Sequence, residues 1–329
     1  MEYRNLSICI IYMNHIFLLD FMLDRLYNVS IMNKLTTEKR RQVVAALVEG
    51  NGIRATVRMT GVSKNTIAKL LVELGAACSE YLDKALVNLN CKRIQCDEIW
   101  SFCYAKEKNV PQELRGKFGY GDVWTWVGMD ADSKLIVSWL VAGRDAGSAF
   151  TFMQDLAKRI ASRVQLTTDG HRAYLMAVED SFGSEIDYAM LVKMYGNDPA
   201  NDTRYSPAEC IGCREVVISG RPDPKHISTS YIERQNLTMR MGMRRFTRLT
   251  NAHSKKVENH IASIAIHYLH YNFCRVHESL RVTPAMEAGV ATHVWSIEEM
   301  IALLDAKGIK PANPIRAEDR SHLDSAESA

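Results

Sequence analysis

The sequence has little net charge and no cysteine pattern of the disulfide type. Its 41 basic and 38 acidic residues leave a formal charge of only +3, so a nucleic-acid partner would show in where the charges lie rather than in their sum. Eight cysteines scattered over 329 residues exclude a disulfide framework and favour a reducing, cytoplasmic setting. With 47% hydrophobic and 24% charged residues, the composition is typical of a soluble globular protein.

The sequence also lacks an uninterrupted apolar run of membrane-spanning length. Residues 6–23 are rich in Ile, Leu, Met and Phe, but Asn14, His15 and Asp20 interrupt them. No cleavage site of small residues follows, which argues against a signal peptide. A methionine then opens a segment that resembles a fresh protein start. We therefore expect residues 1–32 to be a dispensable extension and expect no membrane partner.

Residues 33–76 carry the pattern of a helix-turn-helix domain. Apolar residues at helical spacing follow Thr36, a short helix is expected over residues 53–60, and Gly61 precedes a third helix that Ser63 can cap. Gly75 is expected to end that third helix. The alternative is a plain three-helix bundle. The expected DNA contacts come from its first turns: Lys64, Asn65, Thr66 and Lys69.

The middle of the chain predicts an α/β fold. A linking helix over residues 77–92 leads to a domain over residues 93–281 whose elements read β-β-β-α-β-α-β. This order matches a ribonuclease-H-like fold, a mixed sheet with flanking helices, in which the first and fourth strands are neighbours. The expected strands are 93–103, 123–129, 135–141, 164–168 and 188–192, and the expected helices are 148–162 and 172–182.

Three acidic residues fall at positions that this fold brings together. Asp97 lies in the middle of the first strand, Asp169 follows the fourth, and Glu233 lies on a helix expected to pack on the sheet. Three carboxylates in one place require cations, and a small set of oxygen ligands suits Mg²⁺ or Mn²⁺, as two ions. Glu98 must point to the opposite face from Asp97, so we expect it to pair with an arginine. The alternative is an edge strand with both acids partly hydrated.

Residues 195–229 lack a regular pattern and are expected to be an insertion. They contain Cys210 and Cys213, which are either half of a zinc site or a turn with two half-buried thiols. Residues 282–329 predict a helix from Ser296 to Leu304 and a disordered tail.

A basic stretch runs from Arg234 to Arg281. Its first helix is expected to bury Ile232, Leu237 and Met241. The one-signed charge favours contact with DNA phosphates over an ordinary solvated face. Tyr268, Tyr271 and Phe273 are expected to add stacking surfaces. The arginines expected to contact DNA are Arg234, Arg240, Arg244, Arg245 and Arg248.

The segments around Asp97, Asp169 and Glu233 together resemble the DDE transposases of bacterial insertion sequences, and most of all the insertion sequence one family. They read Cys-Asp-Glu-Ile-Trp, Thr-Asp-Gly-His-Arg-Ala-Tyr and Tyr-Ile-Glu-Arg-Gln-Asn. A further likeness lies in the segment from Tyr271 to Pro284. The resemblance implies that Asp97, Asp169 and Glu233 are the catalytic triad. It also implies that the partners are the terminal inverted repeats and target DNA, and that the enzyme is a homo-oligomer.

Two features depart from that family. No paired cysteines precede Lys34, where the family commonly carries a zinc segment, and the protein is read in a single frame. Three alternatives stay open: a transcription regulator with an inactive ribonuclease-H-like domain, a nuclease of the same fold, and a decayed copy.

Overall fold

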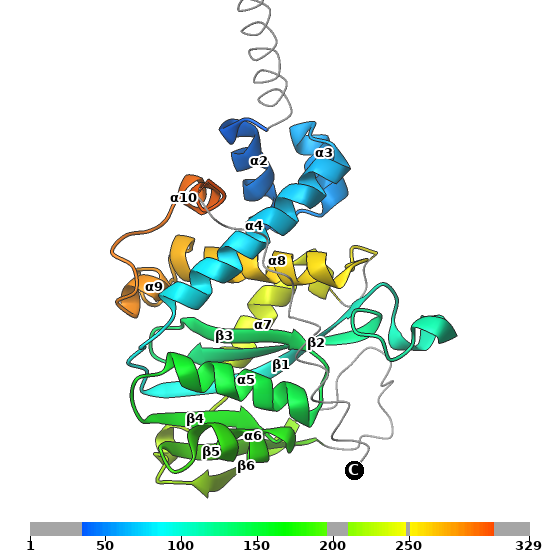
Figure 1. Ribbon diagram of the computed structural model, residues 1–329. Helices are drawn as coiled ribbons and strands as arrows, with labels where there is room; N and C mark the ends of the chain where they lie inside the picture. The colour runs from blue at the N-terminus through cyan, green and yellow to red at the C-terminus, as the bar shows by residue number, and fades with distance from the viewer. Residues whose placement is uncertain (1–34, 196–209, 248–250, 306–329) are drawn as a thin grey trace, which may run out of the picture.

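The computed structural model describes residues 35–195, 210–247 and 251–305 (Figure 1). The predicted extension over residues 1–32 and the predicted tail from residue 306 lie outside the described residues. Among the described residues, no helix combines the length and apolar character needed to cross a membrane.

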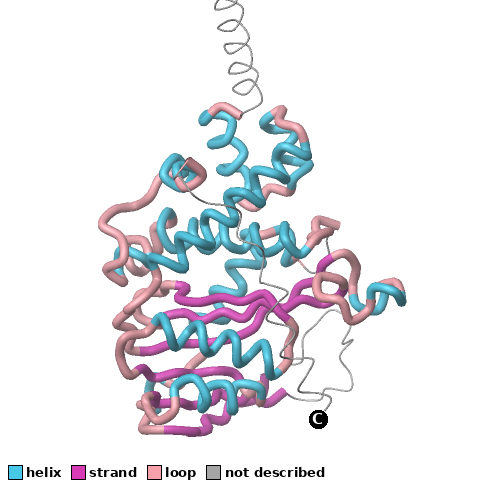
Figure 2. Tube along the Cα trace, in the orientation of Figure 1, coloured by secondary structure: helices cyan, strands magenta, loops and turns pink. Residues whose placement is uncertain are grey.

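A six-stranded mixed sheet forms the centre of the molecule, in the order β3-β2-β1-β4-β5-β6 (Figures 1 and 2). β1 pairs antiparallel with β2 and parallel with β4, so the first and fourth strands are neighbours as predicted. β5 continues the sheet parallel to β4. The bounds are β1 Arg93–Cys103, β2 Gly121–Asp130, β3 Ile136–Ala142, β4 Val164–Asp169 and β5 Ile186–Tyr195.

The edge strand β6 (Cys210–Ser219) corrects the prediction of an irregular insertion. It pairs antiparallel with β5, which is itself longer than predicted, and its register is shifted near both ends. Most of its side chains are exposed, including Ile211 and Val217. A strand without a buried face has no alternating apolar pattern, and for that reason the sequence did not indicate it.

Helices cover both faces of the sheet. The adjacent residues Gln95 and Cys96 mark the two sides of β1: Cys96 lies near Gly128, which approaches Leu156 of α5 (Ala146–Arg159). Gln95 instead faces α7 (Ser230–Gly242). The helix α6 (Ala173–Phe182) packs beside α5 on the first face.

The third helix of the N-terminal region is longer than predicted. α4 runs unbroken from Lys64 to Ala85, after α2 (Thr37–Val48) and α3 (Ile53–Thr60). Gly75 does not end it, and no separate linking helix follows. The reason lies in packing against α8 (Val257–Leu269), because a β-carbon at Gly75 would lie 2.4 Å from the Cα of Ala262.

The C-terminal end of α4 is tied to the sheet domain by Arg159 at the end of α5. Its guanidinium forms an ion pair with Asp83 at 2.6 Å and another with Asp155 at 2.7 Å. It also donates to the main-chain oxygens of Leu82 and Leu86. Arg159 is buried, and its contacts with Asp83, Leu82 and Leu86 tie the end of α4 to α5.

Two expectations about the basic stretch are wrong. On α7, Leu237 and Met241 are exposed, and the buried stripe is Ile232, Gln235, Asn236 and Met239, at true helical spacing. The aromatic residues expected to stack on bases are instead core residues: Tyr268, Tyr271 and Phe273 are at most 5% exposed. α8 lies under α4 rather than on the surface.

The C-terminal segment carries two short helices, α9 (Pro284–Glu287) and α10 (Ile297–Ala302). Ser296 and Glu299 form a capping box at the start of α10. The predicted helix is therefore present, although it is shorter than expected.

Candidate active site

The three acids of the predicted triad line one cleft of about 910 Å³. Asp97 comes from the middle of β1, Asp169 from the end of β4 and Glu233 from α7. The parallel pairing of β1 with β4 places the two aspartates side by side. The cleft also has several basic or polar walls that the sequence did not reveal: Arg144, His171, Lys193 and Asn236.

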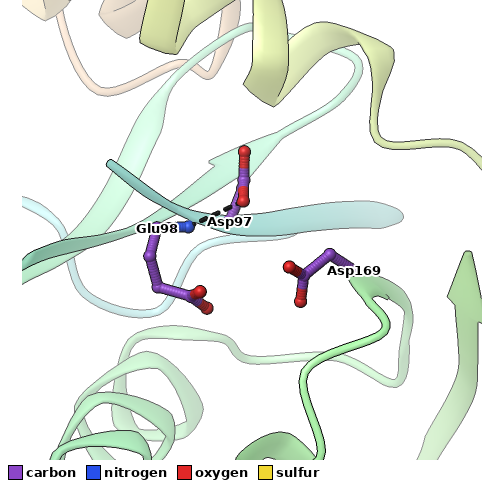
Figure 3. A group of neighbouring side chains, drawn as sticks. All are labelled: Asp97, Glu98 and Asp169. Atoms are coloured by element: carbon purple, nitrogen blue, oxygen red, sulfur yellow. Dashed lines mark hydrogen bonds between the residues drawn. The ribbon is translucent and has the colours of Figure 1, made fainter. Parts of the chain in front are cut away.

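Asp97 and Glu98 point to opposite faces of β1, as predicted (Figure 3). Asp97 accepts hydrogen bonds from the Asn236 side chain at 2.9 Å and from the Glu98 main-chain amide at 2.8 Å. Glu98 is 8% exposed and forms the predicted pair with an arginine, Arg144, at 3.1 Å.

Asp97, Glu98 and Asp169 form the group best suited to a metal ion among the described residues. Each offers one carboxylate oxygen, and these oxygens lie within 4.8 Å of one another (Figure 3). Oxygen-only ligands with several formal negative charges fit a hard divalent cation such as Mg²⁺ or Mn²⁺. The structure therefore adds Glu98 to the two aspartates that the sequence indicated.

The electrostatics of this group favour neutralisation. Burial and, next in size, the negative charge of Asp169 raise the pKa of Asp97 to about 7. The pKa of Glu98 is also raised to about 7 by burial and then by Asp169. Carboxylates with raised pKa values hold protons, or exchange them for a cation when one binds.

These pKa values predict a loss of stability with rising pH. Both carboxyl pKa values are higher in the folded protein than in the unfolded chain, so their contribution to the free energy of unfolding is complete below about pH 4. It is lost as the pH rises through about 7. Urea denaturation in EDTA should show this fall in the wild type and a smaller fall in Asp97→Asn. Equal pH slopes would contradict the prediction, and saturating Mg²⁺ should restore stability at the upper end.

Glu233 lies in the same cleft but is held by other partners. Its Oε2 forms an ion pair with the Lys193 ammonium at 2.5 Å, and its Oε1 accepts a hydrogen bond from the Thr229 hydroxyl. It is therefore absent from the closely spaced group of three. Its charge still contributes to the raised pKa of Asp97.

The position of Glu233 depends on Gln95, a residue that was not predicted to belong to the site. The Gln95 side-chain oxygen accepts from the main-chain amides of Tyr231 and Ile232 at 3.0 and 3.1 Å. Two amides of the first helical turn, which have no partner within a helix, are thereby satisfied. Gln95 lies two residues before Asp97 on the same face of β1, and this spacing is the signal that could have identified it.

Arg144 lies between two of the acids, Glu98 and Asp169. Its guanidinium contacts Glu98 at 3.1 Å and Asp169 at 3.7 Å. It also stacks on the Trp124 ring at 4.7 Å. One cation held by two acids and an aromatic ring partly neutralises the negative charge of Glu98 and Asp169.

The residues predicted to contact DNA differ in their exposure. Lys64, Asn65 and Lys69 are exposed near the start of α4, while Thr66 is half-buried and bonded to Ser63. Of the arginines, Arg234 and Arg244 are exposed, and Arg240 lines the cleft.

Arg245 is turned towards the interior of the protein. It donates to the Ser254 hydroxyl at 2.8 Å, and Ser254 in turn bonds to the buried His260. Arg248 lies outside the described residues.

Cys210 and Cys213 lie on β6 as exposed free thiols. Among the residues that the structure describes, no third histidine, cysteine or acid joins them in a metal-binding group. The expected irregular turn is instead a strand, in which Cys213 is opposite Lys193.

No protein-family model and no curated protein matches this chain. Among solved structures, the chain is similar to the Mos1 transposase in a paired-end complex with the left transposon end. That match has 12% identity and a TM-score of 0.21, and it covers 47% of this chain but only 59% of the Mos1 chain.

Two further matches are also transposase structures. The piggyBac transposase synaptic complex with hairpin DNA matches at 11% identity and a TM-score of 0.35, over 89% of this chain and 76% of that one. The Mos1 strand transfer complex matches at 11% identity and a TM-score of 0.21, over 72% and 76%. Similarity this distant does not assign a function, which must be argued from the residues of the cleft.

Proposed function

We propose that this protein is a transposase that cleaves DNA strands at the terminal inverted repeats of an insertion sequence and joins them to target DNA. The observation that supports this most is the convergence of Asp97, Asp169 and Glu233 on one cleft. Two of these acids come from adjacent strands and the third from a helix on the sheet. The proposal includes the insertion sequence one family, on the strength of the three sequence motifs.

The metal ligands in this proposal are Asp97, Asp169 and Glu233, with Glu98 close enough to assist. When bound, Mg²⁺ or Mn²⁺ ions stabilise the attacking and leaving oxygens of an in-line phosphodiester displacement. Asn236 orients Asp97 through its hydrogen bond, and Gln95 holds the helix that carries Glu233.

Basic residues that could contact a DNA strand lie in the cleft and on the helix that borders it. Arg240 lines it beside the acids, and Arg234 and Arg244 are exposed on and after the same helix. Phosphate contacts of this kind position the strand without reading its sequence. Recognition of the ends is assigned to the helix-turn-helix of residues 33–76, whose third helix is the first part of α4.

Lys64→Ala and Lys69→Ala are expected to weaken binding of the terminal repeats, each by about fivefold, because each removes a cation that can contact a phosphate. Fluorescence anisotropy with a labelled end duplex measures this. Lys84→Ala is the matched control, since Lys84 is also exposed on α4 and pairs with a glutamate four residues away. Unchanged binding in both variants would remove the helix-turn-helix from the proposal.

The proposed activity is tested by incubating purified protein with labelled end duplexes and a target plasmid in Mg²⁺ or Mn²⁺. The ends are taken from the DNA that flanks the gene, where the proposal predicts inverted repeats beside a short target duplication. Joined product supports the transposase. Cleavage without joining indicates a nuclease of the same fold, and binding without either reaction indicates a transcription regulator. A gel-filtration mass measurement of the protein with two ends tests the proposed homo-oligomer.

A further inference from the structure

Lys193 is the cation nearest to the third carboxylate of the cleft. It lies on β5, and its ammonium forms an ion pair with the Glu233 carboxylate at 2.5 Å. Its side chain also lines the cleft, together with Arg240. None of the roles assigned above to the acids, to Asn236 or to Gln95 requires a lysine at this position.

Both members of this ion pair are partly exposed to solvent. The Lys193 side chain is 29% exposed and the Glu233 side chain is 38% exposed. Ion pairs with this degree of exposure contribute about 1 kcal/mol or less, since water and salt screen them. Such a pair can exchange its partners readily when stronger ones arrive.

The proposed function brings a stronger partner for each member of the pair. Asp97 and Asp169 would hold a divalent cation to which the Glu233 carboxylate would also be attracted, and the Lys193 ammonium would be attracted to a DNA phosphate in the cleft. The two exchanges favour each other, because each releases the group that the other needs. Glu233 cannot serve the metal fully while it neutralises the lysine.

We propose that Lys193 binds a DNA phosphate in the cleft and couples DNA binding to metal binding through its ion pair with Glu233. This inference rests on the proposed function, because it needs both DNA and a cation in the same cleft. Thermodynamic linkage makes the effect reciprocal: DNA tightens metal binding by the same factor by which the metal tightens DNA binding.

Arg144 does not offer the same exchange. Its guanidinium already contacts Glu98 and Asp169 and stacks on Trp124. Three partners hold Arg144 in place, so neutralising one acid leaves the other two. Lys193 forms its ion pair with Glu233 itself. The two cations are therefore expected to respond differently when an acid beside them is neutralised.

A double-mutant cycle measured in EDTA isolates the coupling without any catalysis. The probe is a fluorescent duplex that carries the flanking inverted repeat, and the readout is its dissociation constant. Glu233→Gln should tighten DNA binding about tenfold in the presence of Lys193, since it releases the ammonium for a phosphate. In the Lys193→Gln background the same substitution should tighten binding by about twofold at most.

Asp169→Asn is the matched control, because it removes the same charge from the same cleft but from a residue that pairs with Arg144. Its effect on DNA binding should be equal with and without Lys193. Equal tightening by Glu233→Gln in both backgrounds would overturn the coupling while leaving DNA in the cleft. A further outcome is unchanged DNA binding in Arg240→Ala and in each of Glu233→Gln, Lys193→Gln and Asp169→Asn. That result would mean that DNA does not occupy the cleft, and the proposed function would fail instead.

Discussion

Asp97→Asn is expected to lower the rate of strand joining by about a thousandfold or more, with little change in DNA binding. A bound cation contributes several kcal/mol to transition-state stabilisation, and each 1.4 kcal/mol is a factor of ten. Asn keeps the shape of Asp97 and its place beside Asn236 but removes the charge that the proposed metal site requires. Single-turnover joining of labelled ends, with binding measured separately, tests this.

The same loss is expected for Asp169→Asn and Glu233→Gln, because each removes one charge from the same cleft. Asp122→Asn serves as the control, since Asp122 is an exposed acid at the start of β2 and does not line the cleft. Joining at the wild-type rate by the three cleft variants would refute the proposed chemistry. Thermal unfolding in EDTA should show that the Asp97 variant is folded, so lost activity cannot be assigned to misfolding.

Gly75→Leu is expected to lower the free energy of unfolding by about 3 kcal/mol. Helix propensity alone predicts the opposite sign, because leucine is a better helix former than glycine by close to 1 kcal/mol. A β-carbon at this position would lie 2.4 Å from Ala262 Cα and 2.7 Å from its main-chain oxygen. Main-chain atoms cannot rotate away, so α4 and α8 must separate.

Urea denaturation of the full-length protein measures the effect. Glu73→Leu is the control on the same helix, since Glu73 is exposed and its replacement tests propensity without a clash. A Gly75→Leu variant as stable as the wild type would mean that α4 does not pack closely on α8. The free energy of unfolding of Gly75→Ala should lie between those of the wild type and Gly75→Leu, because alanine introduces the clash with the smallest side chain.

The pairing of β1 with β4 was predictable because strand order and the positions of Asp97 and Asp169 both follow from local patterns. Element order fixes which strands are neighbours in this fold. Side chains alternate between the two faces of β1, which places Asp97 and Glu98 on opposite faces. The arginine partner of Glu98 was expected as a residue type. Its identity, Arg144, depends on the loop between β3 and α5, which no local pattern specifies.

Other features depend on contacts between distant segments. Gly75 is a residue type that often ends a helix, yet tertiary packing against Ala262 keeps it inside one. The buried stripe of α7 includes the polar residues Gln235 and Asn236, so an apolar pattern selects the wrong face. Tyr268 is aromatic in a basic stretch and still belongs to the core. Charge and aromaticity describe composition, whereas burial is decided by what covers the segment.

The unbroken course of α4 also sets a length. Its 22 residues at a rise of about 1.5 Å each make a rod of roughly 33 Å, close to ten base-pair steps of B-form DNA. Arg159 clamps one end of the rod to the sheet domain, and the proposed recognition residues lie at the other. In the proposed function, the length of α4 would then fix the distance between the bases that are recognised and the phosphodiester bond that is cut. A one-residue insertion in α4 would rotate the proposed recognition residues by about 100° relative to the cleft. The recognised bases and the cleft would then no longer face the same DNA in the required orientation.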